Sequence, residues 1–497
     1  MPYSVEGLDR PESGSVAEIL GNRRLLVVSN REPFEIRELP TGTRFTPTVG
    51  GLVSALDPVV RATKGSWIAW RRGEAGERPY TAAGPAEGAP YTLRVIPVSE
   101  REAGGYYDGF ANRTLWPLFH GFIGRARFDD DYFSDYKRVN QRFAAAVASS
   151  LAPGDLVWIH DYQLALVPQE IRDCRDDAGK PLGIGATIAY FHHIPFPALE
   201  TFRVLPWARE ILRGLLGAAL VGFHTSSYAE NFLDACEFLL DAAIDRDRSR
   251  VHWAGRWIQV GAFPIGIDVD LWERVARKPE TIAAARALKR DFRTEWVIVG
   301  ADRLDYTKGL KERVLAIEKL LERHPNLRRR VTFVQVAVPS RTRVDEYKQM
   351  KRELDETIGR VNGRFSETGW SPIRYIARSL DQAKLVPLYL AADIGLVTPL
   401  RDGMNLVAME YVASRVDGGG ALVLSDQAGA SERLPDAWMV NPRHLSGIAD
   451  TIAEILLNTP ESVRAARMAA LRRDVRAGDV RQWMEGFLRQ AVAAAES

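Results

Sequence analysis

The chain has 497 residues, 46% of them hydrophobic and 26% charged, which suits two or three domains of an ordinary globular protein. Its 66 basic and 64 acidic residues leave a formal net charge of +2, which disfavours a nucleic-acid partner or a membrane surface. Two cysteines without metal-ligand spacing, no signal-peptide pattern and no apolar run near 18 residues together predict a cytoplasmic protein without a disulfide framework.

In the first half, short apolar runs alternate with helical stretches, which predicts a parallel α/β sheet. Residues 1–22 are polar and are expected to form a loose or docked arm. A glycine loop at 46–53 is expected to open a helix, and residues 83–91 to form a surface loop. Strands are predicted at 25–28, 156–159, 186–191 and 219–223.

The pattern restarts after Asp268, with strands predicted at 296–300, 331–337, 373–376, 394–397 and 421–424 and one or two helices over 461–494. We therefore expect a first domain of residues 1–267, rejoined by a C-terminal helix of about residues 476–497, and a second domain of residues 268–475. Two doubly wound domains imply a ligand cleft between them, at the carboxyl ends of the strands.

Several polar residues follow the predicted strands of the first domain. Arg31 comes after the first strand. Gly50 and Gly51 would let a phosphate approach the backbone, or would simply form a helix-entry turn. Asp161 and His193 follow two neighbouring strands, although a histidine in apolar surroundings is often structural. A predicted loop region is dense in aromatic residues that could stack on sugars or belong to the core: Trp70, Tyr106, Tyr107 and Trp116.

The second domain carries cations at strand ends. Arg303 and Lys308 lie five residues apart across a turn, so they could converge on a diphosphate, or they could be two solvated cations. Arg341 is a further cation after the strand at 331–337.

The stretch 398–413 is expected to be a strand–loop–helix junction. Free backbone N–H groups at the helix start would bind a diphosphate, Asp402 would bind sugar hydroxyls and Glu410 a ribose. The alternative is that Asp402 and Asn405 cap the helix and Glu410 faces solvent.

Other nucleotide motifs are missing from the sequence. There is no G-x-G-x-x-G after a strand, no Walker A motif and no G-x-S-x-G elbow. Two acidic triplets, at 129–131 and 268–270, lie away from strand ends and are expected to be structural. We therefore expect neither a cofactor nor a metal.

Taken together, these segments resemble the trehalose-6-phosphate synthases, retaining glycosyltransferases of family 20. The resemblance spans about residues 23–460 and is carried by ordered motifs: VVSNR (27–31), VGGL (49–52), NRTLWPLFH (112–120), WIHDYQL (158–164), HIPFP (193–197), GFHT (222–225), FPIGID (263–268), DRLDYTKGL (302–310), NGRF (362–365) and LRDGMNLVAMEYVA (400–413). It implies a GT-B fold of two Rossmann-like, doubly wound domains facing a central cleft.

The resemblance also implies roles for individual residues. Donor binding would fall to the following set: Gly50, Gly51, His193, Arg303, Lys308, Asp402, Gly403, Met404, Asn405, Leu406, Val407 and Glu410. Acceptor binding would fall to Arg31, Trp70, Tyr107, Trp116, Asp161 and Arg341. The catalytic set would be Arg303, Lys308, Asp402, His193 and Asp161, with no side-chain nucleophile or general base assigned.

The implied reaction transfers glucose from UDP-, GDP- or ADP-glucose to glucose 6-phosphate with retention. Cations and helix N–H groups would serve in place of a metal. Glycerol 3-phosphate or a cyclitol acceptor stays open as an alternative. A catalytically silent subunit is disfavoured, because the charged motif residues are present. A separate phosphatase would be needed to reach free trehalose, and the sequence leaves open whether the chain forms a homo-oligomer.

Overall fold

The computed structural model describes residues 13–39, 42–47, 51–74, 76–82, 91–176, 178–182, 185–340 and 345–495. By its internal contacts the chain divides into two compact units. Unit 1 comprises Met1–Phe263 together with Arg481–Ser497, and unit 2 comprises Pro264–Val480.

Unit 1 is built on a ten-stranded sheet with the order β10-β11-β12-β9-β8-β7-β1-β4-β6-β5. The strands from β12 to β6 in that order are parallel, whereas β10, β11 and β5 pair antiparallel at the two edges. The bounds are β1 Leu25–Val28, β4 Ser66–Arg72, β5 Tyr80–Ala82, β6 Thr92–Val98, β7 Leu156–His160, β8 Thr187–Phe191, β9 Leu220–Phe223, β10 Ala243–Asp245, β11 Arg250–Trp253 and β12 Arg256–Ala262. A separate hairpin pairs β2 Phe34–Leu39 with β3 Gly42–Pro47.

The four strands predicted in this half are confirmed as β1, β7, β8 and β9, and all their residues are buried. Continuous burial is expected for parallel strands that are covered on both faces. Strands β4 and β6 were not predicted, because charged residues interrupt their apolar pattern.

The helices of unit 1 include one rare element, the π-helix η1. The bounds are α1 Ser13–Leu20, α2 Gly51–Ala62, α3 Glu100–Ala103, η1 Gly104–Leu115, α4 Trp116–Phe119, η2 Ile123–Arg125, α5 Asp130–Ala148, η3 Tyr162–Leu164, α6 Val167–Asp173, α7 Leu199–Phe202, α8 Ala208–Leu215, α9 Ser226–Leu240 and, at the C-terminus, α18 Val480–Ala495. Two expectations are corrected. Within the expected loose or docked arm, residues 13–20 form a helix, which excludes the loose alternative there, and residues 1–12 lie outside the described residues. The aromatic-rich segment around Tyr107 is helical rather than a loop.

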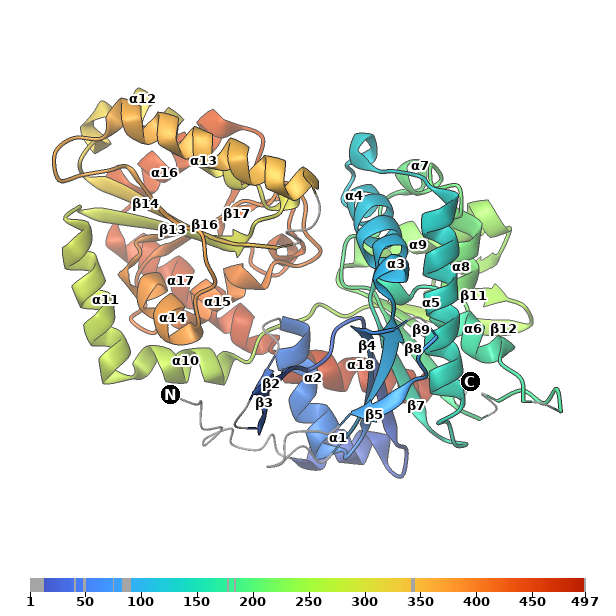
Figure 1. The fold of residues 1–497 in the computed structure, drawn as a ribbon. Coiled ribbons are helices and arrows are strands. Elements are labelled where there is room, and N and C mark those ends of the chain that lie inside the picture. Colours follow the sequence, from blue (N-terminus) through green and yellow to red (C-terminus); the bar gives the residue numbers. More distant parts are fainter. Residues whose placement is uncertain are drawn as a thin grey trace. The chain divides into compact units, whose positions relative to one another are not determined.

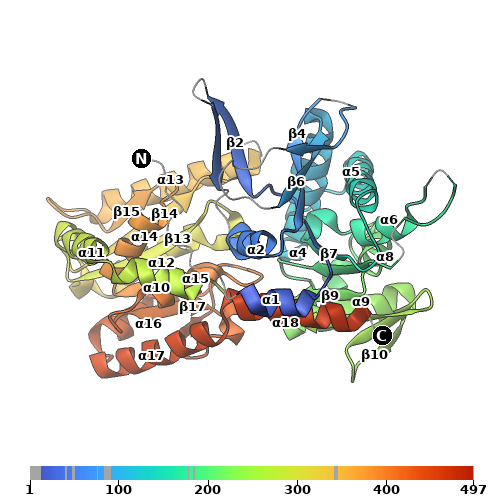
Figure 2. The ribbon, with the colours of Figure 1, turned by 90° about the horizontal axis from the view of Figure 1, so that it is seen from below.

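The C-terminal helix α18 completes the core of unit 1 (Figure 2). Its Trp483 ring lies 5.2 Å from the ring of Trp158 on β7 and 5.1 Å from Phe191 on β8. Phe487 stacks on Trp158 at 4.8 Å. Helix α18 therefore covers strands that lie about 300 residues earlier in the sequence, by burying aromatic surface.

Unit 2 contains a six-stranded parallel sheet of order β15-β14-β13-β16-β17-β18. The strands are β13 Trp296–Arg303, β14 Val331–Val338, β15 Ile373–Ile376, β16 Ile394–Val397, β17 Ala421–Ser425 and β18 Trp438–Val440. All five strands predicted here are confirmed, and β18 was not predicted.

Helices cover both faces of this second sheet (Figure 1). Helices α12, α13 and α16 lie on one side, and α10, α11, α14 and α15 lie on the other. The bounds are α10 Val269–Arg277, α11 Pro279–Phe292, η4 Tyr306–Lys308, α12 Leu310–Arg323, η5 Pro325–Leu327, α13 Asp345–Phe365, α14 Gln382–Ala391, α15 Leu406–Ser414, η6 Gly429–Glu432, α16 Leu445–Leu457 and α17 Glu461–Ala477. The core between sheet and helices includes Phe333, Leu320 and Ile452.

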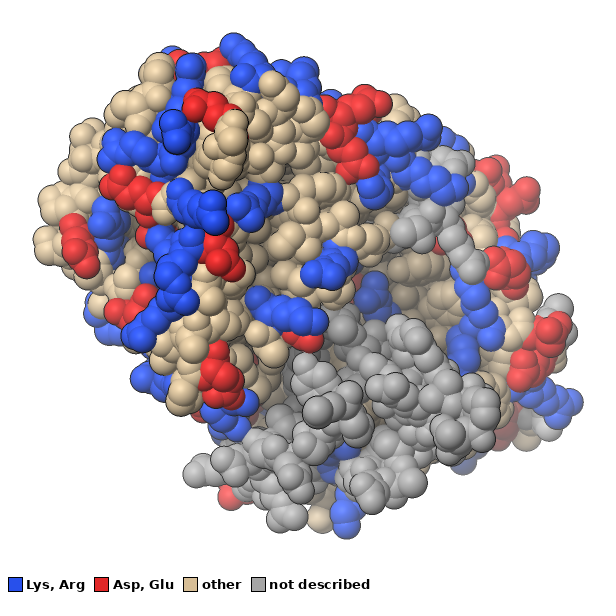
Figure 3. All heavy atoms as spheres, turned by 60° about the vertical axis from the view of Figure 1, so that its left-hand side comes forward, with Lys and Arg blue, Asp and Glu red and all other residues tan. Residues whose placement is uncertain are grey.

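The described part of the surface in Figure 3 carries acidic and basic side chains interspersed rather than in one large single-sign patch. Ion pairs account for part of this mixing, such as Arg360 and Arg364 with Glu318. None of the helices within the described ranges is long and apolar enough to cross a membrane.

Candidate active site

The loop after β1 presents Arg31 on a rigid backbone. The side chain of Asn30 accepts hydrogen bonds at 2.8 Å from both Trp70 Nε1 and the Tyr106 hydroxyl. On the other side of Arg31, Glu32 accepts from Arg71 Nε at 2.8 Å and Nη2 at 3.0 Å.

Arg31 itself is exposed, and its guanidinium has no hydrogen-bond or acidic partner among the described residues. An exposed guanidinium that the described residues leave without an acidic partner, at a strand's carboxyl end, is suited to bind an anion.

The π-helix η1 brings aromatic residues to the same end of the sheet. The Tyr107 ring lies 5.9 Å from that of Trp70, and both residues are only partly buried. Tyr106 is fully buried and belongs to the core. Trp116 is also buried, with its ring 4.2 Å from His120. π-Helical turns are rare and occur frequently at functional sites.

Asp161, directly after β7, has a strained backbone. Its φ of 76° and ψ of 164° fall in a region that is essentially restricted to glycine. Its Oδ1 accepts hydrogen bonds from the backbone N–H groups of Tyr162 at 3.0 Å and His193 at 3.2 Å. The carboxylate therefore joins the ends of β7 and β8 at a residue whose backbone is strained.

His193 forms a pair with a second histidine. Its Nε2 lies 3.0 Å from Nδ1 of His160, the last residue of β7. His160 is fully buried, whereas His193 is partly exposed. Burial lowers the pKa of His160 to about 3, and it also lowers the pKa of His193 well below the ordinary value, so both imidazoles are neutral at neutral pH.

In unit 2, the loop after β13 and the loop before α15 meet at an ion pair. Lys308 Nζ lies 2.5 Å from Asp402 Oδ2, and both side chains are about nine-tenths buried. Asn405 Nδ2 donates to the same carboxylate oxygen at 3.0 Å. The alternative that Lys308 is a solvated cation is therefore wrong. Gly309 permits the approach, because a Cβ at this position would lie 2.3 Å from the carbonyl oxygen of Thr398.

The loop from Asp402 to Asn405 is packed into the protein. Asp402, Gly403, Met404 and Asn405 are all buried. Asn405 begins α15 with φ at 74°, and its side chain accepts no hydrogen bond from the helix. The alternative that the Asn405 side chain caps the helix is therefore wrong, and the first N–H groups of α15, beginning at Leu406 and Val407, are not satisfied by that side chain.

Glu410 lies one turn into α15 and is partly buried. Burial, together with the smaller effect of the nearby Asp302 carboxylate, raises the pKa of its carboxyl group to about 7. The alternative that Glu410 stands on a solvated face is therefore wrong. A carboxyl group with this pKa can donate or accept a hydrogen bond near neutral pH.

Arg303 is the last residue of β13 and is partly buried. Gly51 is the first residue of α2. Gly50 and Arg341 lie outside the described residues.

The two acidic triplets are structural at their first residues, which cap helices: Asp129 caps α5, and Asp268 caps α10. Among the described residues no group of three or more His, Cys, Asp or Glu is arranged to hold a metal ion.

These arrangements can be compared with known proteins. The family model of glycosyltransferase family 20 matches residues 23–493. The chain belongs to glycosyltransferase family 20. A trehalose-6-phosphate synthase from Mycolicibacterium vanbaalenii is 42% identical over 496 residues, which are 98% of this chain and 99% of that protein.

Solved structures agree with this assignment. A UDP-forming α,α-trehalose-phosphate synthase from Burkholderia xenovorans in complex with glucose-6-phosphate has a TM-score of 0.84 and 34% identity, covering 94% of this chain and 100% of that chain. An E. coli trehalose-6-phosphate structure bound with UDP-2-fluoro glucose has a TM-score of 0.85 and 32% identity, covering 94% of this chain and 99% of that chain. The chain is therefore a glycosyltransferase with the two parallel-sheet domains of the GT-B fold.

A buried ion pair in this glycosyltransferase was not predicted from the sequence. Arg313 of α12 is fully buried, and its Nη2 lies 2.5 Å from Asp302 and 2.8 Å from the carbonyl oxygen of Lys308. Its Nε donates to Thr398 Oγ1 at 3.1 Å. Arg313 therefore supports both loops that meet at Lys308, but a single arginine in an amphipathic helix gives no sequence signal for this role.

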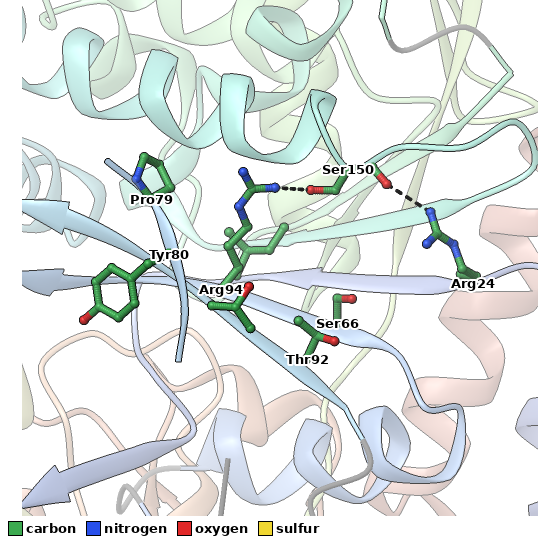
Figure 4. Close-up of a pocket in the computed structure, with 9 residues that line it drawn as sticks. Arg24, Ser66, Pro79, Tyr80, Thr92, Arg94 and Ser150 are labelled. Carbon is green, nitrogen blue, oxygen red and sulfur yellow. Dashed lines mark hydrogen bonds between the residues drawn. The ribbon is translucent and has the colours of Figure 1, made fainter. Parts of the chain in front are cut away.

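Figure 4 shows a surface pocket of unit 1. It lies at the opposite end of the sheet from Arg31, Asp161 and His193, which follow the strands β1, β7 and β8. Its lining includes Arg24, which precedes β1, and the first residues of β4 and β6, Ser66 and Thr92. Arg94 in this pocket donates to the carbonyl oxygen of Ala146 at 2.9 Å, and so holds the C-terminal end of α5. The pocket is thus at the amino ends of the strands, where this class of fold does not place its ligands.

Proposed function

We propose that this glycosyltransferase moves glucose from a nucleotide-glucose donor to glucose 6-phosphate, with retention, and forms α,α-trehalose 6-phosphate. The observation that carries the proposal is the buried Lys308–Asp402 pair at the start of α15, in a chain of family 20. UDP-glucose is the preferred donor, because solved relatives are described as UDP-forming or as bound with UDP-2-fluoro glucose.

Unit 2 supplies most of the proposed donor site. Arg303 and Lys308 bind the diphosphate, together with the backbone N–H groups of Leu406 and Val407 at the start of α15. Asp402 accepts from glucose hydroxyl groups, supported by the backbone of Gly403, Met404 and Asn405, and Glu410 binds the ribose. From unit 1 we assign Gly50, Gly51 and His193 to the donor as well.

Unit 1 supplies the proposed acceptor site. Arg31 binds the phosphate of glucose 6-phosphate, which is supported by the exposure of its guanidinium and by the lack of an acidic partner for it in the described parts of the chain. Tyr107 and Trp116 assist at the phosphate, and Trp70 and Asp161 contact the sugar. From unit 2, Arg341 is assigned to the same phosphate.

The proposed chemistry is charge stabilisation rather than nucleophilic catalysis. Arg303 and Lys308 stabilise the negative charge that develops on the departing diphosphate. The acceptor hydroxyl attacks the anomeric carbon on the face that the diphosphate leaves, and a diphosphate oxygen takes its proton. Because Lys308 contacts Asp402, one ammonium group can link the sugar-binding carboxylate to the leaving group.

A product assay tests the proposal. The purified chain is mixed with glucose 6-phosphate and, in turn, UDP-, GDP- and ADP-glucose, with a chelator present, and the products are identified by mass and by anomeric NMR. We expect an α,α-linked disaccharide phosphate, fastest with UDP-glucose. A product formed with glycerol 3-phosphate but not with glucose 6-phosphate would overturn the acceptor assignment.

A matched pair of variants tests the acceptor phosphate site. Arg31→Gln is expected to raise KM for glucose 6-phosphate at least about tenfold, because an uncompensated guanidinium is lost. Arg175→Gln is the control, since Arg175 is also exposed but donates to the backbone carbonyl groups of Arg172 and Cys174 at the end of α6. Equal KM values for the two variants would contradict the role of Arg31.

A further inference from the structure

The hydrogen bond between His160 and His193 restricts which ring nitrogens carry protons. Each neutral imidazole has one N–H group and one lone pair. The contact joins Nδ1 of His160 to Nε2 of His193 at 3.0 Å, so one of these two atoms must carry a hydrogen and the other must not. Two tautomeric arrangements satisfy this condition.

The surroundings of the pair keep it neutral in either arrangement. His160 lies against the Trp158 ring at 4.7 Å. His193 lies against His224 at 5.5 Å and Trp483 at 6.1 Å. A charged imidazole would thus meet other imidazoles and apolar rings. The one carboxylate bonded to this segment, Asp161, accepts from the backbone N–H of His193 rather than from its ring.

The two arrangements differ at Nε2 of His160. This atom is buried and has no hydrogen-bond partner within the described ranges of the chain. If His193 donated to His160, then Nε2 of His160 would carry a buried hydrogen without an acceptor. If His160 donates instead, Nε2 holds only an unused lone pair. Buried N–H groups without a partner are rarer than acceptors with unused lone pairs, so the second arrangement is favoured.

In the favoured arrangement His193 carries its hydrogen on Nδ1. The His193 side chain is partly exposed, and its Nδ1 has no hydrogen-bond partner among the described residues. This N–H is therefore available to a ligand oxygen, whereas Nε2 is occupied by His160.

We propose that His160 is a positioning residue that fixes His193 in the Nδ1–H tautomer, as a neutral hydrogen-bond donor. His193 then donates to a hydroxyl oxygen of the ligand and cannot take a proton through Nδ1, so it is not the general base of the reaction. The identity of the ligand, a nucleotide-bound glucose, rests on the proposed function, whereas the tautomer does not.

Nitrogen-15 NMR of the full chain labelled at histidine tests the tautomer directly. The signals of His193 are identified by their loss in His193→Ala. We expect the Nδ1–H tautomer in the wild-type chain without ligand. A dominant Nε2–H tautomer would overturn the proposal, whether or not the chain turns over any donor, so this result is independent of the proposed function.

Two variants at position 160 separate positioning from packing. His160→Asn keeps an N–H donor close to the place of Nδ1, whereas His160→Leu removes it. We expect the Asn variant to keep the Nδ1–H signal of His193 and the Leu variant to lose it. With UDP-glucose as the varied substrate, kcat/KM should fall about tenfold more in the Leu variant than in the Asn variant. KM for glucose 6-phosphate should stay the same.

His192→Asn is the matched control. His192 is as deeply buried as His160, but its Nδ1 contacts the Tyr190 hydroxyl at 3.1 Å instead of His193. This control should leave the tautomer of His193 unchanged. Equal losses of kcat/KM in the Asn and Leu variants at position 160, with the His193 tautomer unchanged in both, would mean that His160 serves packing alone and would refute the proposal.

Discussion

The strained backbone of Asp161 leads to a prediction about the relative stability of two variants at this position. With φ at 76° and ψ at 164°, a residue with a Cβ is strained by about 1–3 kcal/mol. Replacing Asp161 with Ala keeps this strain and loses the hydrogen bonds to Tyr162 and His193, each worth about 0.5–1.5 kcal/mol. Replacing it with Gly loses the same bonds but relieves the strain.

The difference between these two variants isolates the strain. In a regular helix or strand, glycine lowers the free energy of unfolding by roughly 0.5–1 kcal/mol relative to alanine, because glycine loses more conformational entropy on folding. Subtracting this cost from the strain leaves the Asp161→Gly chain more stable than the Asp161→Ala chain by about 1 kcal/mol. The usual order of the two residues is therefore reversed at this position.

Urea unfolding followed by tryptophan fluorescence measures the comparison, with the transition of unit 1 analysed separately. Both variants are expected to lose activity, because the carboxylate is gone. An Ala variant that is equal to or more stable than the Gly variant would refute the strain argument. Asp241→Gly serves as the control: this exposed residue also has a positive φ, 54°, at the end of α9, so glycine should stabilise the chain there while activity stays unchanged.

Three further predictions concern unit 2. Arg303→Ala is expected to lower kcat by ~100-fold or more, because one charge-stabilising donor is lost, whereas Arg330→Ala at a surface ion pair should have no effect; a fall of less than about threefold in initial-rate assays would contradict the leaving-group role. Burial raises the pKa of Glu410 from 4.5 to about 7. The protonated carboxyl group therefore contributes fully to the free energy of unfolding below pH 4.5, and this contribution is lost as the pH rises through 7. The loss amounts to about 3 kcal/mol. Urea unfolding between pH 4.5 and 8 should therefore show the wild type losing stability relative to Glu410→Gln. A difference in the free energy of unfolding that stays constant over this pH range would contradict the raised pKa of Glu410. Arg313→Met is expected to destabilise unit 2 by about 3–5 kcal/mol, because Asp302 keeps a buried charge without its partner. Adding Asp302→Leu should restore much of this stability, and an unfolding midpoint that does not recover would count against the buried pair.

The sequence by itself determined the strands whose residues are continuously apolar. The predicted runs at 25–28, 156–159 and 394–397 are strands at the centres of their sheets, because a parallel strand covered on both faces needs apolar side chains throughout. The ordered motifs also indicated the family, and the family model matches residues 23–493.

Tertiary structure decided the elements whose local pattern is mixed. Strand β4 contains Arg71 and Arg72, whose charges are accommodated by ion pairs with Glu32 and Glu100. The π-helix η1 has an irregular periodicity, and its close approach to α5 requires glycine: a Cβ on Gly105 would lie 2.1 Å from Asp135 Oδ2. No local propensity encodes either outcome, because each depends on a partner distant in the sequence.

The same reason limits what could be predicted for the candidate site. The sequence indicated Lys308, Asp402, Asp161 and His193 as residues that follow strands. It could not pair Lys308 with Asp402 across 94 residues, or His193 with His160 across 33. Those pairs form because parallel strands bring their carboxyl ends to one edge of a sheet, and burial there then sets which groups are charged and which carry protons.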